Sequence, residues 1–209
     1  MSGRFITLEG IEGAGKSTLA RALKEYLESQ GKSVLLTREP GGTALAERLR
    51  QIVLERGSEP VSPLAETLVM FAARALHVSN LIRPALARGT WVVCDRFTDA
   101  TRAYQGAGRG VDGALIEHLA QAVQADLAAD LTLLLDLPVS AGLARARARS
   151  GADSDRFEAE TLAFFERVRA GYLAVARAAP ARVRIIDASQ PELLVRSAVI
   201  EAVTPLVTR

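Results

Sequence analysis

The chain of 209 residues carries 26 lysines and arginines against 24 aspartates and glutamates, and this net charge of +2 gives no bulk argument for nucleic-acid binding. Its 49% hydrophobic content suits one buried core, so we expect a single domain over residues 1–209. A lone cysteine, Cys94, excludes an intrachain disulfide, and no stretch approaches 18 apolar residues, so we expect a cytoplasmic protein that binds no membrane.

The first two predicted elements are a strand over residues 4–9 and a helix over residues 16–30, and a phosphate-binding motif joins them. Residues 10–17 read Gly-Ile-Glu-Gly-Ala-Gly-Lys-Ser, which matches the P-loop pattern G-x-x-x-x-G-K-[ST]. The glycines let backbone N–H groups surround a polyphosphate, while Lys16 reaches the β and γ oxygens and Ser17 binds Mg²⁺. The motif predicts that a nucleoside triphosphate binds, without saying which reaction follows.

The second predicted strand, residues 33–38, runs into the sequence Thr37-Arg38-Glu39-Pro40-Gly41-Gly42-Thr43. Pro-Gly-Gly favours a rigid turn, which would hold Arg38 and Glu39 at the edge of a sheet. A plain surface turn with solvated charges is the alternative that this segment leaves open.

The third predicted strand, residues 91–95, ends in Asp95-Arg96-Phe97. A strand-terminal carboxylate suits Mg²⁺, and the arginine beside it can form two parallel hydrogen bonds to phosphate oxygens. A surface ion pair is the alternative. Further along, Tyr104 and Gln105 lie beside a glycine-rich segment that we predict to be a turn, where a ring and an amide are available to contact a base.

Short apolar runs alternate with longer stretches of helical period along the chain, which is typical of a parallel sheet wrapped by helices. The apolar runs lack the alternation of half-exposed strands, so we expect the strands to be buried on both faces. The expected strands are residues 4–9, 33–38, 91–95, 131–137 and 183–187, and the expected helices are residues 16–30, 43–56, 64–88, 112–125, 139–149, 156–178 and 191–207. Gly31 and Gly89 are expected at helix C-termini. Ligands of such α/β folds bind at the carboxyl ends of the strands.

Seven motifs in order make the chain similar to the bacterial thymidylate kinases, which phosphorylate dTMP with ATP. They are the P-loop at 10–17, the run at 37–43, Phe71-Ala72-Ala73-Arg74, Asp95-Arg96-Phe97, Ala103-Tyr104-Gln105-Gly106, Leu135-Asp136-Leu137-Pro138 and Asp155-Arg156-Phe157-Glu158. The resemblance covers nearly the full length. It implies a three-layer α/β P-loop kinase fold with a five-stranded parallel sheet, helices on both faces and a short lid at about residues 145–157.

The resemblance also implies transfer of the γ-phosphate of ATP to dTMP, giving dTDP and ADP for dTTP synthesis, with Mg²⁺ as cofactor and a homodimer as the assembly. Lys16 and Ser17 would hold the ATP phosphates and Mg²⁺, and Arg96 would bridge the donor and acceptor phosphates. The implied ATP-binding residues are Gly10, Ile11, Glu12, Gly13, Ala14, Gly15, Lys16, Ser17, Thr18, Arg145, Arg149 and Arg156. The implied catalytic residues are Glu12, Lys16, Asp95, Arg96 and Arg149, and the implied metal ligands are Ser17 and Asp95.

In relatives whose P-loop carries no arginine, as here with Glu12, the lid supplies the catalytic arginine. The resemblance therefore favours Arg149 first, and then Arg145 and Arg156, for that role. The polar face of an ordinary helix is the alternative reading for Arg145 and Arg147.

For the acceptor, the resemblance implies that Arg38 binds the phosphate of dTMP, Arg74 bonds the thymine carbonyl, and Tyr104 crowds the 2′ position. The implied dTMP-binding residues are Arg38, Pro40, Met70, Phe71, Arg74, Arg96, Thr101, Tyr104 and Gln105. Pro40 is expected to follow a cis peptide bond. Family members usually place a phenylalanine four residues before the thymine-binding arginine, where this chain has Met70, so Phe71 and Met70 both remain candidates for covering the base.

Two other classes of function are weighed against this one, namely another P-loop nucleotide kinase and a nucleotide-dependent switch or ATPase. A GTPase switch needs Asn-Lys-x-Asp, whereas the one asparagine of the chain, Asn80, is followed by Leu81. His77 and His118 lack partners at metal-ligand spacing, so we expect no metal role for either.

Overall fold

The computed structural model describes residues 3–55, 59–150, 156–157 and 160–208, and for residues 149 and 150 it describes the backbone alone. Its sheet has five parallel strands in the order β2-β3-β1-β4-β5. The strands are β1 (Phe5–Glu9), β2 (Val34–Arg38), β3 (Trp91–Asp95), β4 (Leu131–Asp136) and β5 (Val183–Asp187). The parallel sheet and all five strands predicted from the sequence are confirmed.

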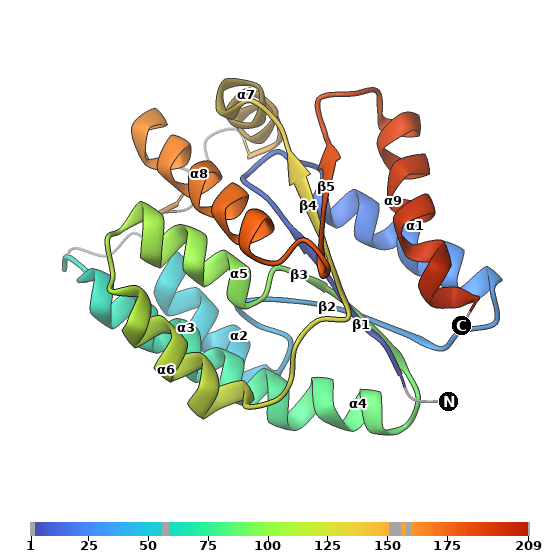
Figure 1. Cartoon of the computed structure of the whole chain (residues 1–209). Coiled ribbons are helices and arrows are strands. Elements are labelled where there is room, and N and C mark those ends of the chain that lie inside the picture. The colour runs from blue at the N-terminus through green and yellow to red at the C-terminus, as the bar shows by residue number, and fades with distance from the viewer. Residues whose placement is uncertain (1–2, 56–58, 151–155, 158–159, 209) are drawn as a thin grey trace.

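Helices cover both faces of this sheet. They are α1 (Lys16–Ser29), α2 (Ala44–Leu54), α3 (Pro63–His77), α4 (Arg83–Ala87), α5 (Thr98–Thr101), α6 (Gly113–Gln124), α7 (Val139–Ser150), α8 (Leu162–Ala178) and α9 (Glu192–Val207), with two π-helical segments, η1 (Val78–Ile82) and η2 (Arg102–Gly108). Figure 1 shows α1 and α9 side by side on one face, and α3, α4, α5, α6 and α8 on the other. The predicted three-layer fold is confirmed.

Side-chain caps explain where several helices begin. Thr43, Ser62 and Thr161 each accept a hydrogen bond from the backbone N–H three residues later, ahead of α2, α3 and α8. The helix expected over residues 156–178 was therefore placed too early, because Thr161 caps α8 at Leu162.

Two helices end just before glycines, as predicted. Gly31 after α1 and Gly89 after α4 adopt φ values of 72° and 79°, the left-handed conformation that terminates helices. The helix predicted over residues 64–88 proves to be three segments, α3, η1 and α4. Pro84, at the start of α4, has no N–H to donate to the preceding turn, which accounts for the wider π-turn of η1 just before it.

The glycine-rich segment after β3 is helical, and the turn predicted there is wrong. A Cβ at Gly108 would lie 2.7 Å from the ring of Phe164, and a Cβ at Gly171 would lie 2.7 Å from Ala107. These glycines allow η2 and α8 to pack closely, so their function is contact between helices and not reversal of the chain.

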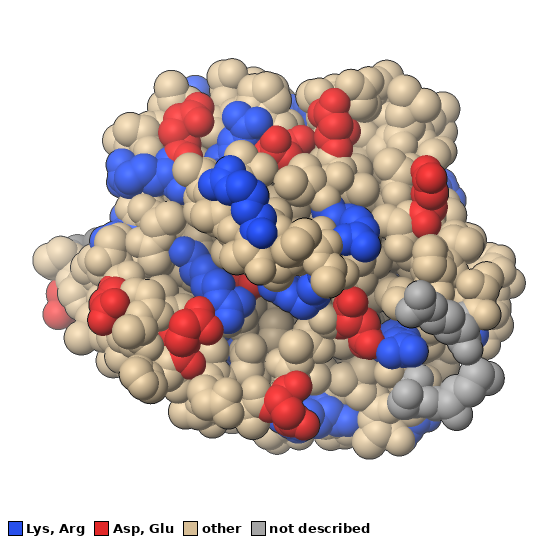
Figure 2. Space-filling view, in the orientation of Figure 1, with Lys and Arg blue, Asp and Glu red and all other residues tan. Residues whose placement is uncertain are grey.

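The central strands β1, β3 and β4 form the centre of the core, whereas the edge strands β2 and β5 are only partly buried, so the expectation that all five strands are buried on both faces is wrong for these two. Cys94 on β3 is free and wholly buried, and burial raises the pKa of its thiol well above the ordinary value. The buried core thiol and the buried Trp91 both agree with prediction. None of the helices in the described ranges is long and apolar enough to cross a bilayer. Figure 2 shows acidic and basic side chains interspersed over one face of the molecule.

Candidate active site

The P-loop connects β1 to α1 and depends on glycines for its path. Gly10, Gly13 and Gly15 adopt φ values of 137°, 71° and 88°, which other residues rarely reach. Lys16 donates from Nζ to the carbonyls of Gly10 at 3.0 Å and Ile11 at 2.8 Å. Burial, and then the positive charge of Arg96, lower the pKa of Lys16 to about 8. The ammonium thus lies inside the curve of the loop, where a polyphosphate is bound in this motif.

Helix α7 packs directly on the P-loop. A Cβ at Gly13 would lie 2.0 Å from the carbonyl oxygen of Gly142, and a Cβ at Gly142 would lie 2.7 Å from that of Glu12. Two glycines therefore allow the backbones to touch. This contact brings the helix that carries Arg145 and Arg149 beside the phosphate loop.

A pocket of about 370 Å³ opens at the carboxyl edge of β1, β2 and β3, within the size range of small-molecule sites. Most of the residues predicted from the sequence line it. They are Glu12, Gly13, Gly15, Lys16, Ser17, Thr18, Arg38, Pro40, Met70, Arg74, Asp95, Arg96, Thr101, Tyr104 and Gln105.

Six of the predicted residues lie elsewhere. The side chains of Ile11 and Ala14 are packed in the core, and Gly10 lies against β4, so these three offer a ligand their backbone at most. Arg145 donates to the carbonyl of Ala188 at 2.9 Å. Arg156 donates to Val53 at 3.0 Å and to Glu66 at 2.6 Å. Phe71 is the sixth.

Met70, and not Phe71, lines the pocket. Phe71 is 2% exposed and packs with Ile116 and Ala120, while the guanidinium of Arg74 lies over its ring at 4.8 Å. Phe71 thus supports Arg74 from beneath, which corrects its prediction as a residue that faces the base. The side chain of Arg149, the residue favoured as the catalytic lid arginine, lies outside what the structure describes.

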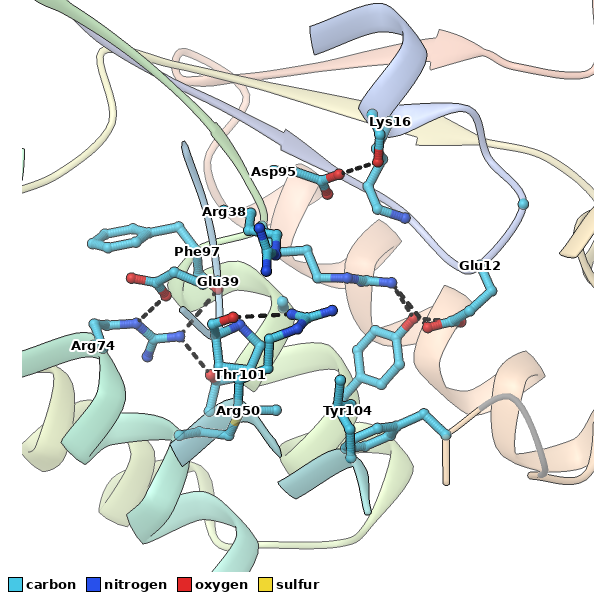
Figure 3. Close-up of a pocket in the computed structure, with 18 of the residues that line it drawn as sticks. Glu12, Lys16, Arg38, Glu39, Arg50, Arg74, Asp95, Phe97, Thr101 and Tyr104 are labelled. Carbon is cyan, nitrogen blue, oxygen red and sulfur yellow. Dashed lines mark hydrogen bonds and ion pairs between the residues drawn. The ribbon is translucent and has the colours of Figure 1, made fainter. Parts of the chain in front are cut away.

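Arg96 occupies the middle of the pocket. Its backbone has a φ of 72°, a left-handed conformation that is uncommon outside glycine and is found at functional sites. Nη1 donates to Gly10 at 2.9 Å and to Tyr172 at 3.0 Å, and Nη2 donates to Glu12 at 2.9 Å and to Tyr104 at 3.0 Å. Figure 3 shows Glu12 and Tyr104 meeting on one side of the pocket. Four acceptors, two from the P-loop and one each from η2 and α8, therefore fix one guanidinium.

A buried carboxylate lies behind Arg96. Glu9 at the end of β1 accepts from the backbone N–H of Phe97 at 2.7 Å and from the hydroxyl of Tyr172 at 2.9 Å. Burial, and then the negative charge of Asp99, raise the pKa of Glu9 to about 8. Glu9 thus holds the hydroxyl that accepts from Arg96.

Arg74 forms the opposite end of the pocket from Lys16 (Figure 3). Its Nε donates to Glu39 at 2.7 Å, and its Nη2 donates to Thr101 at 2.9 Å. Glu39 also contacts Nδ1 of His77 at 3.0 Å, so His77 is a buried structural histidine. The Glu39–Pro40 peptide bond is cis, which confirms the expectation for Pro40.

One nitrogen of Arg74 remains unpaired. Nη1 is buried and has no hydrogen-bond partner among the residues that the structure describes. Buried donors are rarely left unsatisfied, and Arg74 lines the pocket, so this nitrogen is available to a ligand with a carbonyl oxygen.

Oxygen ligands for a hard cation also meet in the pocket. The hydroxyl of Ser17 donates to the carboxylate of Asp95 at 2.7 Å. Mg²⁺ is usually held by one or two protein oxygens together with substrate phosphates and water. The described residues contain no cluster of three or more histidine, cysteine or acidic side chains of the kind an all-protein metal site needs. Ser17 and Asp95 therefore fit Mg²⁺ that arrives with a nucleotide.

Sequence reasoning missed several lining residues, and Arg50 on α2 is the clearest. Its Nη1 donates to the carbonyl of Pro40 at 2.9 Å, near the exposed guanidinium of Arg38. The spacing of residues on α2 could have indicated Arg50. Glu47 lies three residues earlier, on the same helix face, and accepts hydrogen bonds from Arg38 and from the backbone N–H of Gly42. The first turns of α2 thus belong to the same wall as the loop before them.

Comparison with known proteins agrees with this geometry. A family model described as thymidylate kinase matches residues 8–199. The chain is 54% identical over 207 residues to the thymidylate kinase of Alkalilimnicola ehrlichii, covering 99% of this chain and 95% of that protein. It is 59% identical over 190 residues to the thymidylate kinase of Pseudomonas syringae pv. syringae, covering 91% and 90%. The crystal structure of thymidylate kinase from Ehrlichia chaffeensis superposes with a TM-score of 0.79 at 33% identity, covering 96% and 98%. The chain belongs to the thymidylate kinase family.

Proposed function

We propose that this chain transfers the γ-phosphate of ATP to dTMP, giving dTDP and ADP. The unpaired Nη1 of Arg74 carries the proposal, because it offers a buried donor to a base carbonyl at the end of the pocket away from Lys16. A P-loop at one end and a base-reading arginine at the other suit a reaction that joins two nucleotides through their phosphates.

The chemistry of the acceptor indicates how the residues act. A phosphate oxygen of dTMP is already anionic, so no general base is needed. The barrier comes from bringing two polyanions together while charge spreads over the transferred group. Lys16 and Arg96 supply fixed positive charge in the pocket, and Asp95 positions its neighbours without accepting a proton.

Mg²⁺ would be held by Ser17 and Asp95 and would neutralise charge on the phosphate oxygens of ATP. An arginine of residues 145–157 would complement it from the side of α7, with Arg149 the first candidate. Tyr104, fixed by its bonds to Glu12 and Arg96, would crowd the 2′ position of the acceptor and favour deoxyribose.

A coupled assay of ADP release tests the proposal with dTMP, dUMP, dCMP, dGMP and thymidine as acceptors. We expect dTMP to give the highest kcat/KM, with little ADP formed when no acceptor is present. Equal turnover without an acceptor would instead indicate an ATPase, and a preference for another acceptor would indicate a different nucleotide kinase.

We also propose that residues 1–209 act as one catalytic domain and that two copies form a homodimer through α2 and α3. These helices expose large apolar side chains at Leu45, Ile52, Leu64 and Leu68, each at least 47% exposed. Because α2 and α3 pack against each other, these side chains are available to form one apolar patch, and large exposed apolar patches mark interaction sites.

Charge on this face is expected to separate the two copies. We predict that the double substitution Leu64→Glu and Leu68→Glu halves the mass measured by light scattering, because a carboxylate is costly to bury in an apolar interface. Leu193→Glu on α9, at a leucine that is 77% exposed, is the matched control and should leave the mass unchanged. A wild-type chain that is monomeric would disprove the dimer.

A further inference from the structure

Glu66 on α3 is a buried carboxylate that the reaction itself does not explain. It is 1% exposed, and it accepts hydrogen bonds from Gln105 and Arg156 and forms an ion pair with Arg109. Oε1 accepts from Nε2 of Gln105 at 2.7 Å, and Oε2 accepts from Arg156 at 2.6 Å and lies 3.5 Å from Nε of Arg109. The two oxygens thus have different partners, the amide on one and the two arginines on the other.

This arrangement fixes which way the amide of Gln105 points. A carboxylate accepts hydrogen bonds and does not donate them, so it selects the NH₂ group of the amide. The amide oxygen then remains for other partners, and no hydrogen bond to Oε1 of Gln105 occurs among the residues that the structure describes. Gln105 lines the pocket, so it offers a ligand an acceptor.

Gln105 and Arg74 line the same pocket and offer it an acceptor and a donor. The free Nη1 of Arg74 is the donor, and Oε1 of Gln105 is the acceptor. A ring carbonyl next to a ring N–H, as in thymine and uracil, matches this pair. Cytosine presents an amino group next to an unprotonated ring nitrogen, which is the reverse pattern.

We infer that Glu66 is a positioning residue that sets base specificity, because it holds the Gln105 amide in the orientation that accepts a ring N–H. The inference rests on the proposed function and adds a residue that touches no substrate. Glu66 contacts both Gln105 and Arg156, so one carboxylate lies between the amide proposed to read the base and an arginine that follows α7.

Glu66→Gln tests the inference with an isosteric change. The two arginines should retain the oxygen of the new amide at the Oε2 position, so its NH₂ group faces Gln105. The amide of Gln105 must then rotate so that its oxygen accepts from the amide at position 66, and its own NH₂ group faces the base. We expect kcat/KM for dTMP to fall about 10- to 100-fold, since a buried hydrogen bond is replaced by two opposed donors.

The comparison of acceptors separates this effect from general damage. Activity with dUMP should fall as much as activity with dTMP, because both bases carry the same N–H, while activity with dCMP should not fall. The dTMP to dCMP ratio therefore drops at least tenfold. An equal loss with all three acceptors, or no loss, would overturn the inference.

The charge-swapped variant Glu66→Gln with Gln105→Glu is the matched control. The carboxylate at position 105 accepts from the amide at position 66 and offers its second oxygen to the base, so preference for dTMP over dCMP should return. Thermal unfolding is measured for both variants. Where the single variant is unfolded at assay temperature, loss of dTMP preference in the folded double variant overturns the inference.

Assays of the wild-type chain distinguish failure of the proposed function from failure of the inference about Glu66. Absence of dTMP-dependent ADP release in the wild type would disprove the proposed function and the inference with it. Wild-type activity on dTMP together with an unchanged dTMP to dCMP ratio in Glu66→Gln would disprove the inference alone.

Discussion

Replacing Lys16 with methionine is expected to lower dTMP-dependent ADP release by about 10³-fold, the upper range for loss of one fixed donor at a developing charge. Methionine keeps the apolar stem of the lysine and removes the ammonium that lies between the carbonyls of Gly10 and Ile11. The substitution therefore removes charge from the phosphate loop with little change in packing. The coupled assay at saturating ATP and dTMP measures the loss.

Lys24→Met is the matched control for this prediction. Lys24 lies two turns later on α1, pairs with Glu28 at 3.7 Å, and does not line the pocket, so turnover should stay at the wild-type level. The pH profile gives a second check. Because the pKa of Lys16 is lowered to about 8, the amine loses its proton as pH rises through that value, and kcat/KM for ATP should fall there. Turnover of Lys16→Met within tenfold of wild type would contradict the assignment.

The strands and the phosphate loop were predictable because their signals are local. The strands are continuous apolar runs, and the P-loop is a contiguous motif in which each glycine has a conformational reason. The segment around Gly108 was not, since glycine there allows contact with α8, a helix more than fifty residues away in sequence. Local sequence does not distinguish glycine that permits packing from glycine that permits a turn.

In the site too, residues in local motifs were predictable and residues that depend on distant contacts were not. Residues in strand-terminal motifs, such as Asp95 and Arg96, line the pocket as the sequence indicated. Phe71 was misjudged because a shift of one residue along α3 turns the ring from the pocket toward Ile116. Glu66 carries no motif of its own, and its importance comes from two hydrogen-bond donors and one ion-pair partner on other parts of the chain.

Arg96 is expected to give the second large effect, and its geometry predicts which kinetic constant changes. Its guanidinium donates to Gly10 and Glu12 of the P-loop and to Tyr104 and Tyr172 of the facing helices, so under the proposed function it would lie between ATP and dTMP. All four Nη hydrogens are donated to protein acceptors, so the guanidinium would exchange some of these partners for phosphate oxygens when the nucleotides bind. Its contribution should therefore be largest in the transition state, where charge is shared between them.

We predict that Arg96→Ala lowers kcat about 10³-fold, with a smaller change in the KM values, and that Arg96→Lys recovers only part of the loss. Lysine restores the charge, but its single ammonium does not reproduce the planar fork that bonds on two sides. Arg83→Ala, which removes an exposed arginine paired with Asp126, is the control and should retain wild-type kcat. An Arg96→Ala variant that raises KM while kcat is preserved would show that Arg96 binds the substrates equally in the ground and transition states, and its assignment as a catalytic residue would then be wrong.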